Sequence, residues 1–232
     1  MKKNVVLNWS GGKDATMAFH QLSHHENIEV ISLLTSINSK RERITMHGVP
    51  LSLLKRQVDA LNQQLDLITL PENISMEKYS SIVREKAQQH HQDGISHYAY
   101  GDIFLQDLRD FRDEEAAKSQ LKTLYPLWGL NTKELAMQFI HLGYKAIVVA
   151  VSSAKLSQEF AGRIYDKEFI TDLPSNIDPC GENGEFHTFV FDGPLFKHPI
   201  DFTKGTTSLH RYASSDNSDS KWDNGVWFCD IS

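Results

Sequence analysis

Val5-Val6-Leu7-Asn8-Trp9-Ser10-Gly11-Gly12-Lys13-Asp14-Ala15-Thr16-Met17-Ala18 is the stretch of sequence that decides the fold. An apolar, β-branched run breaks at two glycines and a helical pattern follows at once, which predicts a buried strand, a tight turn and a helix. Gly11 and Gly12 permit positive φ and close approach of a ligand to the backbone. The unpaired N–H groups at the start of the helix then face the turn, an arrangement that binds anions.

The side chains of this turn strengthen the prediction of an anion site, although a plain structural turn is the alternative. Ser10 adds a hydroxyl donor and Lys13 a compact positive charge. Asp14 falls in the first helical turn, where the helix dipole favours a carboxylate and where it can also hold magnesium. The spacing excludes a Walker A loop, which has four residues between its glycines. We therefore predict a phosphate site of another kind.

Beyond this turn, strands alternate with helices through the first half of the chain. Strands are predicted at residues 4–9, 28–35, 65–70 and 97–100, and helices at 14–25, 51–61, 75–91 and 105–121. This alternation predicts an α/β fold, a parallel sheet with helices on both faces. Ligands of such sheets bind at the carboxyl ends of the strands. The turn Ser10–Asp14, the residues after Thr35 and the pair Gly101-Asp102 should therefore meet at one edge, with a long loop from Ser36 to Val49.

The second half predicts a smaller α+β domain. A helix is expected at 132–142, a strand at 146–151, an aromatic strand after the turn near residue 184, and a hairpin in the last thirty residues interrupted by Ser214–Ser220. Proline and glycine break the pattern between Leu124 and Leu130, so we place the domains at residues 1–124 and 125–232.

Composition narrows the class of protein. The 232 residues carry a net charge of −6 with a pI near 6.0, which argues against a nucleic-acid partner. Cys180 and Cys229 form no Cys-x-x-Cys motif, and the apolar run after Met-Lys-Lys is too short for a signal peptide or a membrane span. We expect a cytoplasmic protein with no membrane partner. A homodimer is an open alternative to a monomer.

Charged and histidine side chains supply further candidates. The helix predicted at 105–121 presents either a solvated face with internal ion pairs or an Arg109 or Arg112 that reaches a ligand. In Gly181-Glu182-Asn183-Gly184-Glu185-Phe186-His187-Thr188, two carboxylates and a histidine either act as bases or serve a turn and a strand face. His47 has the same two interpretations. Histidines at predicted helix ends are expected to be solvated: His24, His25, His90 and His91.

The run Ser-Gly-Gly-Lys-Asp resembles the PP-loop of the ATP pyrophosphatases, which grip the β and γ phosphates and cleave ATP between α and β. Together with Met46–Pro50, Tyr100–Ile103, Pro126–Gly129 and Gly181–Thr188, it makes the chain similar to the diphthine–ammonia ligase family across residues 4–196. The resemblance implies a HUP-type domain that binds ATP and Mg²⁺. It also implies adenylation of a substrate carboxylate, which in the family is that of diphthine, followed by ammonia transfer.

The resemblance also implies roles for individual residues. ATP binding is assigned to Ser10, Gly11, Gly12, Lys13, Asp14, Leu34, Gly101 and Asp102, with Leu34 meeting adenine from the end of the second strand. Asp14 and Asp102 would hold magnesium. Substrate binding is assigned to His47, Gly129, Glu182, Glu185 and His187, and catalysis to Lys13, Asp14, Glu182 and Glu185.

The sequence departs from the family pattern in three places. Ala15 stands where the PP-loop has Ser or Thr, with Thr16 beside it, and Asn183 stands where the family often has Gly. The extra C-terminal domains of the eukaryotic enzymes have no counterpart, which leaves the acceptor open. Two alternatives stay open. One is a tRNA sulfur transferase, for which Cys180 is the cysteine that lies near a motif. The other is a sensor that binds ATP or AMP without chemistry, which Ala15 keeps open.

Overall fold

A computed structural model describes residues 2–40, 42–44, 47–71, 74–211 and 225–232. Its strands are β1 (Lys3–Asn8), β2 (Ile28–Asn38), β3 (Arg43–Ile44), β4 (Leu65–Leu70), β5 (His97–Ala99), β6 (Lys122–Leu124), β7 (Lys145–Ser152), β8 (Phe186–Asp192), β9 (Lys204–Arg211) and β10 (Gly225–Ile231). Its helices are α1 (Lys13–Ser23), α2 (Leu51–Ala60), α3 (Met76–Gln92), α4 (Gln106–Ala117), α5 (Thr132–His141), α6 (Lys167–Asp172) and a 3₁₀ turn at Gln158–Phe160.

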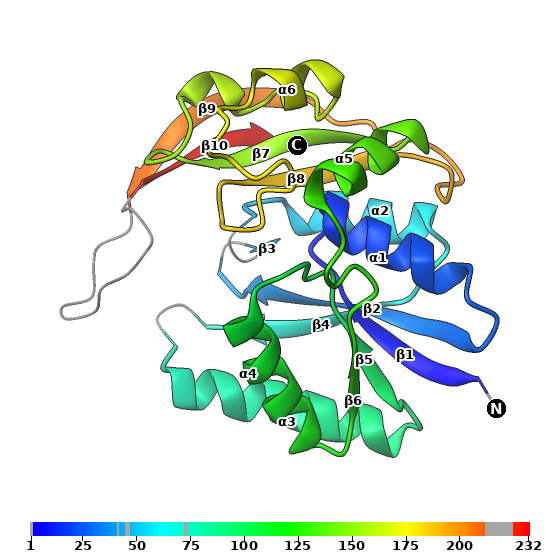
Figure 1. The fold of residues 1–232 in the computed structure, drawn as a ribbon. Helices are drawn as coiled ribbons and strands as arrows, with labels where there is room; N and C mark the ends of the chain where they lie inside the picture. The colour runs from blue at the N-terminus through cyan, green and yellow to red at the C-terminus, as the bar shows by residue number, and fades with distance from the viewer. Residues whose placement is uncertain (1, 41, 45–46, 72–73, 212–224) are drawn as a thin grey trace.

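The first sheet has its parallel strands in the order β4-β2-β1-β5-β6, and the short β3 pairs antiparallel with the end of β2. Helices α1 and α2 cover one face of this sheet, and α3 and α4 cover the other (Figure 1). The prediction of an α/β fold with helices on both faces is confirmed. β1 lies in the middle of the sheet, with β2 paired to one side of it and β5 to the other. The switch point of the sheet therefore lies at the carboxyl ends of β1 and β5.

The second sheet is antiparallel, with the order β8-β7-β10-β9. It lies above α1 and α2, so these helices are sandwiched between the two sheets, while α6 covers its outer face (Figure 1). A single apolar cluster contains Leu7 of β1, Met17 of α1, Val148 of β7 and Phe189 of β8. Burial of this cluster fixes the second sheet onto the first. The domain boundary near residue 124 stays a prediction.

The hairpin predicted in the last thirty residues is confirmed, because β9 and β10 pair antiparallel with Leu209 opposite Trp227. The tract Ser214–Ser220 lies outside the described residues. None of the helices in the described ranges is long and apolar enough to cross a membrane.

Two local predictions were wrong, and one strand was not predicted. The long loop from Ser36 is shorter, because β2 continues to Asn38 and β3 returns beside it. The helix predicted to Leu121 ends at Ala117, and Gln120 takes a φ of 59° before the unpredicted strand β6. The three residues of β6 are too few to show an alternating strand pattern in the sequence, and they form a strand because they pair with β5.

The histidines at helix ends divide into two groups. His24 and His25 are exposed, as predicted. The prediction for His90 was wrong: it is buried, with its Nδ1 2.8 Å from the Tyr98 hydroxyl and its Nε2 3.2 Å from Asp66. His91 is half-buried.

Candidate active site

The glycine-rich loop (Ser10–Asp14) joins β1 to α1 at the switch point of the parallel sheet. Gly11 has a φ of 77°, a conformation that favours glycine, and the Ser10 hydroxyl accepts a 3.3 Å hydrogen bond from the Gly12 amide. The carbonyl of Gly12 then accepts from Thr16 to begin the helix. The predicted strand, turn and helix are therefore confirmed.

Lys13 is buried at the junction between the loop and the second sheet. Its ammonium donates to Asp14 at 2.7 Å and to the carbonyl of Cys180, and it lies 5.3 Å from the centre of the Phe186 ring. Burial by itself would lower the pKa of Lys13, but the neighbouring carboxylate of Asp14 brings the net pKa above its usual value. Lys13 therefore carries its charge into a site shared by both halves of the chain.

Gly101 and Asp102 follow β5 and meet the start of α1, as the sheet topology predicts. A Cβ on Gly101 would lie 2.9 Å from the carbonyl carbon of Asp14 and 3.0 Å from the amide of Ala15, so only glycine fits against the helix there. Burial raises the pKa of Asp102, and the nearby charge of Asp14 raises it further. Arg112 of α4 opposes this rise, with its Nε 3.0 Å from an Asp102 oxygen. Arg112 thus forms an ion pair with Asp102 at the site, and Arg109 pairs with Asp113 within α4 at 3.8 Å, so the ligand-directed role of either arginine stays a prediction.

Glu182 brings the acidic turn of the second half to the same edge. One of its carboxylate oxygens accepts hydrogen bonds from the amides of Ile103 (2.7 Å) and Phe104 (3.4 Å), directly after Asp102. Burial raises the pKa of Glu182 to about 7, against the lowering effect of the Ile103 amide, and the charges of Asp14 and Asp102 raise it as well. Glu182 thus has the pKa of a base that works near neutral pH.

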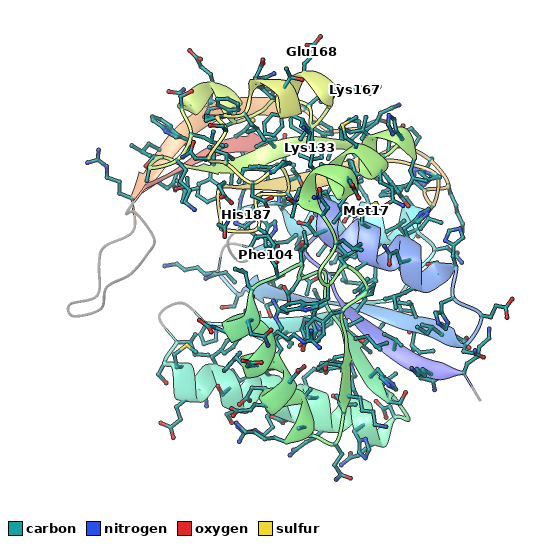
Figure 2. All side chains as sticks on the ribbon, in the orientation of Figure 1. Met17, Phe104, Lys133, Lys167, Glu168 and His187 are labelled. Atoms are coloured by element: carbon teal, nitrogen blue, oxygen red, sulfur yellow. The ribbon has the colours of Figure 1, made fainter. Side chains whose placement is uncertain are left out.

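The other substrate candidates lie beside this turn. Glu185 is 2% exposed. Its Oε1 accepts a 3.2 Å hydrogen bond from the side-chain amide of Asn183 and lies 3.7 Å from the Lys155 ammonium. His187, on β8, packs its ring against His47 with centroids 4.3 Å apart. Burial, then the charge of His47, lowers the pKa of His187 well below its usual range, so His187 is neutral. His187 lies between the two sheets, on the same side of the molecule as Phe104 (Figure 2).

Two candidates have a different setting from the one predicted. Leu34 is buried inside β2, and its carbonyl accepts a 2.7 Å hydrogen bond from the Trp9 amide. The predicted adenine contact assumed that β2 ends at Leu34, but the strand continues to Asn38. Gly129 is exposed with a φ of 74°, and its amide donates to the carbonyl of Ile103 at 2.8 Å. It therefore ties the 126–130 segment to the loop after β5.

Sequence reasoning missed two residues that contact the glycine-rich loop. Gln57 of α2 donates to the Gly11 carbonyl at 2.9 Å, and the Thr188 hydroxyl of β8 accepts from the Lys13 amide at 3.0 Å. Both residues are far from the loop in sequence: Gln57 is 46 residues from Gly11, and Thr188 is 175 residues from Lys13, so no local spacing links them to it. Thr188 does, however, fall inside the motif that also holds Glu182 and Glu185.

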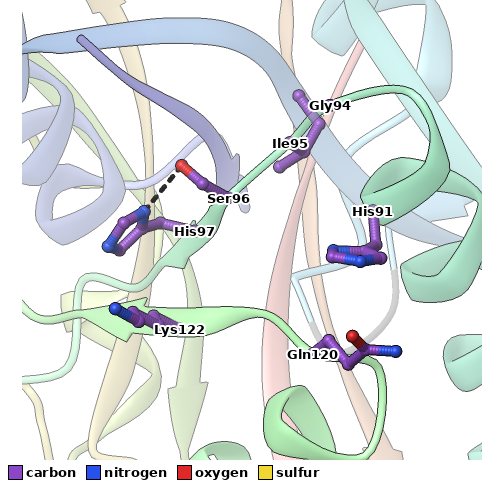
Figure 3. Close-up of a pocket in the computed structure, with 7 residues that line it drawn as sticks. All are labelled: His91, Gly94, Ile95, Ser96, His97, Gln120 and Lys122. Carbon is purple, nitrogen blue, oxygen red and sulfur yellow. Dashed lines mark hydrogen bonds between the residues drawn. The ribbon is translucent and has the colours of Figure 1, made fainter. Parts of the chain in front are cut away.

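A pocket of about 330 Å³ lies at the amino ends of β5 and β6, beside the end of α3 and at the opposite end of these strands from the glycine-rich loop (Figure 3). It is lined by His91, Gly94, Ile95, Ser96, His97, Gln120 and Lys122. None of the predicted site residues lines it, so the candidate active site is not this pocket.

The residues at the loop fit a magnesium ion that arrives with phosphate. Mg²⁺ in phosphate-transfer sites is held through one or two carboxylates together with substrate oxygens. Asp14 and Asp102 supply two carboxylates. Among the described residues, the buried Oδ2 of Asp102 has no hydrogen-bond partner, although the Arg112 Nε lies 3.0 Å from it as an ion-pair partner. Within the described ranges, no three His, Cys, Asp or Glu side chains form a ready-made metal cluster.

A parallel sheet with a glycine-rich anion loop at its switch point, a lysine in the loop and carboxylates around it defines the class of protein: an α/β protein of the nucleotide-binding type. Comparison with known families gives the particular one. The chain belongs to the diphthamide synthase family, because residues 1–123 match the model of the diphthamide synthase N-terminal domain and residues 131–232 that of its C-terminal domain.

Individual relatives carry the name diphthine–ammonia ligase. The protein from Danio rerio is 27% identical over 170 residues, covering 70% of this chain and 64% of its own. That from Schizosaccharomyces pombe is 33% identical over 87 residues, 36% of this chain and 14% of its own, and that from Homo sapiens 29% identical over 112 residues, 46% and 42%. The chain thus matches less than two thirds of the length of each of these relatives.

A solved structure, the U34-tRNA thiolase NcsA from Methanococcus maripaludis with its [4Fe-4S] cluster, aligns over 60% of this chain and 56% of its own. The TM-score is 0.37 and the sequence identity is 15%. A TM-score at this level supports no conclusion about this chain.

Proposed function

We propose that the protein is an ATP-dependent ligase that adenylates a substrate carboxylate and transfers ammonia to it, with a diphthine-type acceptor. The observation that carries the proposal is the hydrogen bond from the Ile103 amide to Glu182, which joins the acidic turn to the sheet edge that holds the glycine-rich loop. This hydrogen bond brings the candidate phosphate-binding loop close to Glu182, a carboxyl whose pKa burial raises to about 7. The names of the relatives suggest the acceptor and ammonia.

The reaction divides between the two ends of the site. A carboxylate oxygen of the acceptor attacks the α-phosphorus of ATP, the bond to the bridging oxygen breaks, and pyrophosphate leaves. Amides of the glycine-rich loop and the ammonium of Lys13 stabilise the charge that develops on pyrophosphate, each charge-assisted hydrogen bond contributing about 1.5–3 kcal/mol. Asp14 and Asp102 would hold the magnesium ion, which neutralises phosphate charge when bound.

Ammonia then attacks the acyl carbon, AMP leaves, and the nitrogen gives up one proton. Glu182 is our candidate to accept it, because a carboxylate with a pKa of about 7 is matched to that task. Neutral His187, beside His47, and the buried Glu185 line the acceptor end. They orient the substrate in this proposal.

Cys180, the candidate cysteine for a sulfur transferase, is poorly suited to carry a persulfide. Cys180 is buried, its Sγ lies 3.3 Å from the Thr132 carbonyl, and burial raises the pKa of its thiol well above the usual range. A persulfide carrier requires an accessible thiolate. These properties favour the ligase over the sulfur transferase.

The test is phosphorus NMR of ATP, Mg²⁺, ammonium and a diphthine-bearing protein acceptor with the enzyme. We expect AMP and pyrophosphate that depend on the acceptor, and Lys13→Ala should slow their formation at least about tenfold. Lys133→Ala, an exposed lysine on α5, is the matched control and should leave the rate unchanged (Figure 2). ADP and phosphate would overturn the mechanism, and tight nucleotide binding without any turnover would establish a sensor instead.

A further inference from the structure

The glycine-rich loop lacks a hydroxyl at Ala15, and its neighbour does not supply one. Ala15 is buried in the first turn of α1. Thr16 is fully buried, and its hydroxyl donates to the Gly12 carbonyl at 2.9 Å, inside the helix. The proton of Thr16 is therefore committed to the backbone, and the loop itself has no second hydroxyl beside that of Ser10.

A hydroxyl reaches the loop from the second sheet instead. Thr188 is 2% exposed, and its Oγ1 accepts a 3.0 Å hydrogen bond from the Lys13 amide. A Cβ on Gly12 would lie 3.4 Å from the same oxygen, so the hydroxyl sits over the middle of the loop. A threonine hydroxyl has one proton to donate besides the bonds it accepts. Among the residues that the structure describes, none accepts that proton from Thr188.

The position of Thr188 is fixed on both sides of the loop. The amide of Val190, two residues further along β8, donates to the Gly11 carbonyl at 2.9 Å. Gln57 donates to the carbonyl of Val190 at 2.6 Å and to that of Gly11 at 2.9 Å. β8 is thus bonded to the loop at Gly11 and at Lys13, and the hydroxyl between these bonds is held in place.

We propose that Thr188 supplies the hydroxyl donor to the β and γ phosphates that the loop of this chain lacks at Ala15. The proposal rests on the proposed function, because it assumes that the loop binds the polyphosphate of ATP. Its consequence is that the phosphate site is completed by a strand of the second sheet. Binding of the triphosphate then depends on the contact between the two sheets.

The experiment measures the dissociation constants of Mg-ATP and AMP by calorimetry. Thr188→Val keeps the shape and removes the hydroxyl, so the constant for ATP should rise about tenfold or more, while AMP, which lacks the β and γ phosphates, binds as before. Thr188→Ser, which keeps the hydroxyl, should stay within about twofold of the starting protein. Adding Ala15→Ser to Thr188→Val should restore most of the lost affinity for ATP.

The outcomes separate this proposal from the one on which it rests. If the unaltered protein does not bind ATP, the proposed function fails. If it binds ATP and Thr188→Val binds ATP equally well, the role of Thr188 fails alone. A third outcome would also overturn the proposal. If Thr188→Val loses affinity for ATP and AMP equally, has a lower melting temperature and is not restored by Ala15→Ser, then Thr188 only caps α1.

Discussion

Gln57, on α2, donates a 2.6 Å hydrogen bond to the carbonyl of Val190, on β8. The same amide nitrogen donates to Gly11 at 2.9 Å, and its oxygen accepts from the indole of Trp9 at 2.9 Å. Gln57 is fully buried. One side chain thus joins a helix, the glycine-rich loop and the second sheet.

The first prediction concerns this side chain. Gln57→Ala leaves buried partners such as the Trp9 indole without a hydrogen bond and opens a cavity, so the free energy of unfolding should fall by about 2–5 kcal/mol. Urea denaturation measures the loss. Gln64→Ala, at an exposed position after the same helix, should change it by no more than about 0.5 kcal/mol. Equal stabilities of the two variants would show that the Gln57 contacts contribute nothing.

The second prediction concerns the packing of Gly101 against α1. A methyl group there would meet backbone atoms of Asp14 and Ala15 at 2.9–3.0 Å, and backbone cannot move aside as a flexible side chain can. Overpacking of this kind costs about 1–3 kcal/mol, and if it displaces the helix start, ATP affinity should fall about tenfold. Gly205→Ala, on β9, should leave ATP affinity unchanged. Unaltered affinity in Gly101→Ala would mean that the loop after β5 does not position the helix.

The third prediction is a pH dependence due to Glu182. Because burial raises the pKa of this carboxyl to about 7, Glu182 is mostly protonated below pH 7 and becomes a base above it. Expressed per free ammonia, log kcat/KM should rise with pH up to about 7 and then level off. Glu182→Gln should remove this rise and lower the rate about 100-fold. The exposed Glu134→Gln is the control, and a rise that survives in Glu182→Gln would assign it to another group.

The fourth prediction concerns stability and the network around Asp66. Burial opposes ionisation of this carboxyl, but Ser32 at 2.5 Å and Lys86 at 3.2 Å hold the pKa of Asp66 below its usual value. A depressed pKa contributes stability above the unfolded-state pKa of about 4, and that contribution is lost as pH falls through the folded-state value.

Asp66→Asn should therefore lower the free energy of unfolding by about 1–2 kcal/mol at pH 7. The difference from the unaltered protein should shrink below pH 4, which denaturation at pH 7 and at about pH 3 measures. Asp59→Asn, at an exposed position on α2, gives the background effect of losing one charge. A difference that does not change with pH would show that the Asp66 carboxylate is not the stabilising species.

The sequence by itself determined the order of most elements and the nature of the glycine-rich loop. Leu65–Leu70 was predicted with the bounds of β4, and the strand before Trp9 and the helix after Gly12 were placed within about two residues. These features are local: an apolar run, two adjacent glycines and a helical period follow from neighbouring residues. Parallel topology then placed Gly101 and Asp102 at the same sheet edge as the loop.

Only the tertiary structure decided which side chains from distant segments meet there. β6 forms because β5 offers it a pairing edge, and His90 is buried because Asp66 and Tyr98 give it partners. Thr188 reaches the Lys13 amide because burial of a common apolar core presses β8 onto α1. Such contacts depend on how the two sheets pack together, and that packing cannot be predicted from the spacing of residues along the chain.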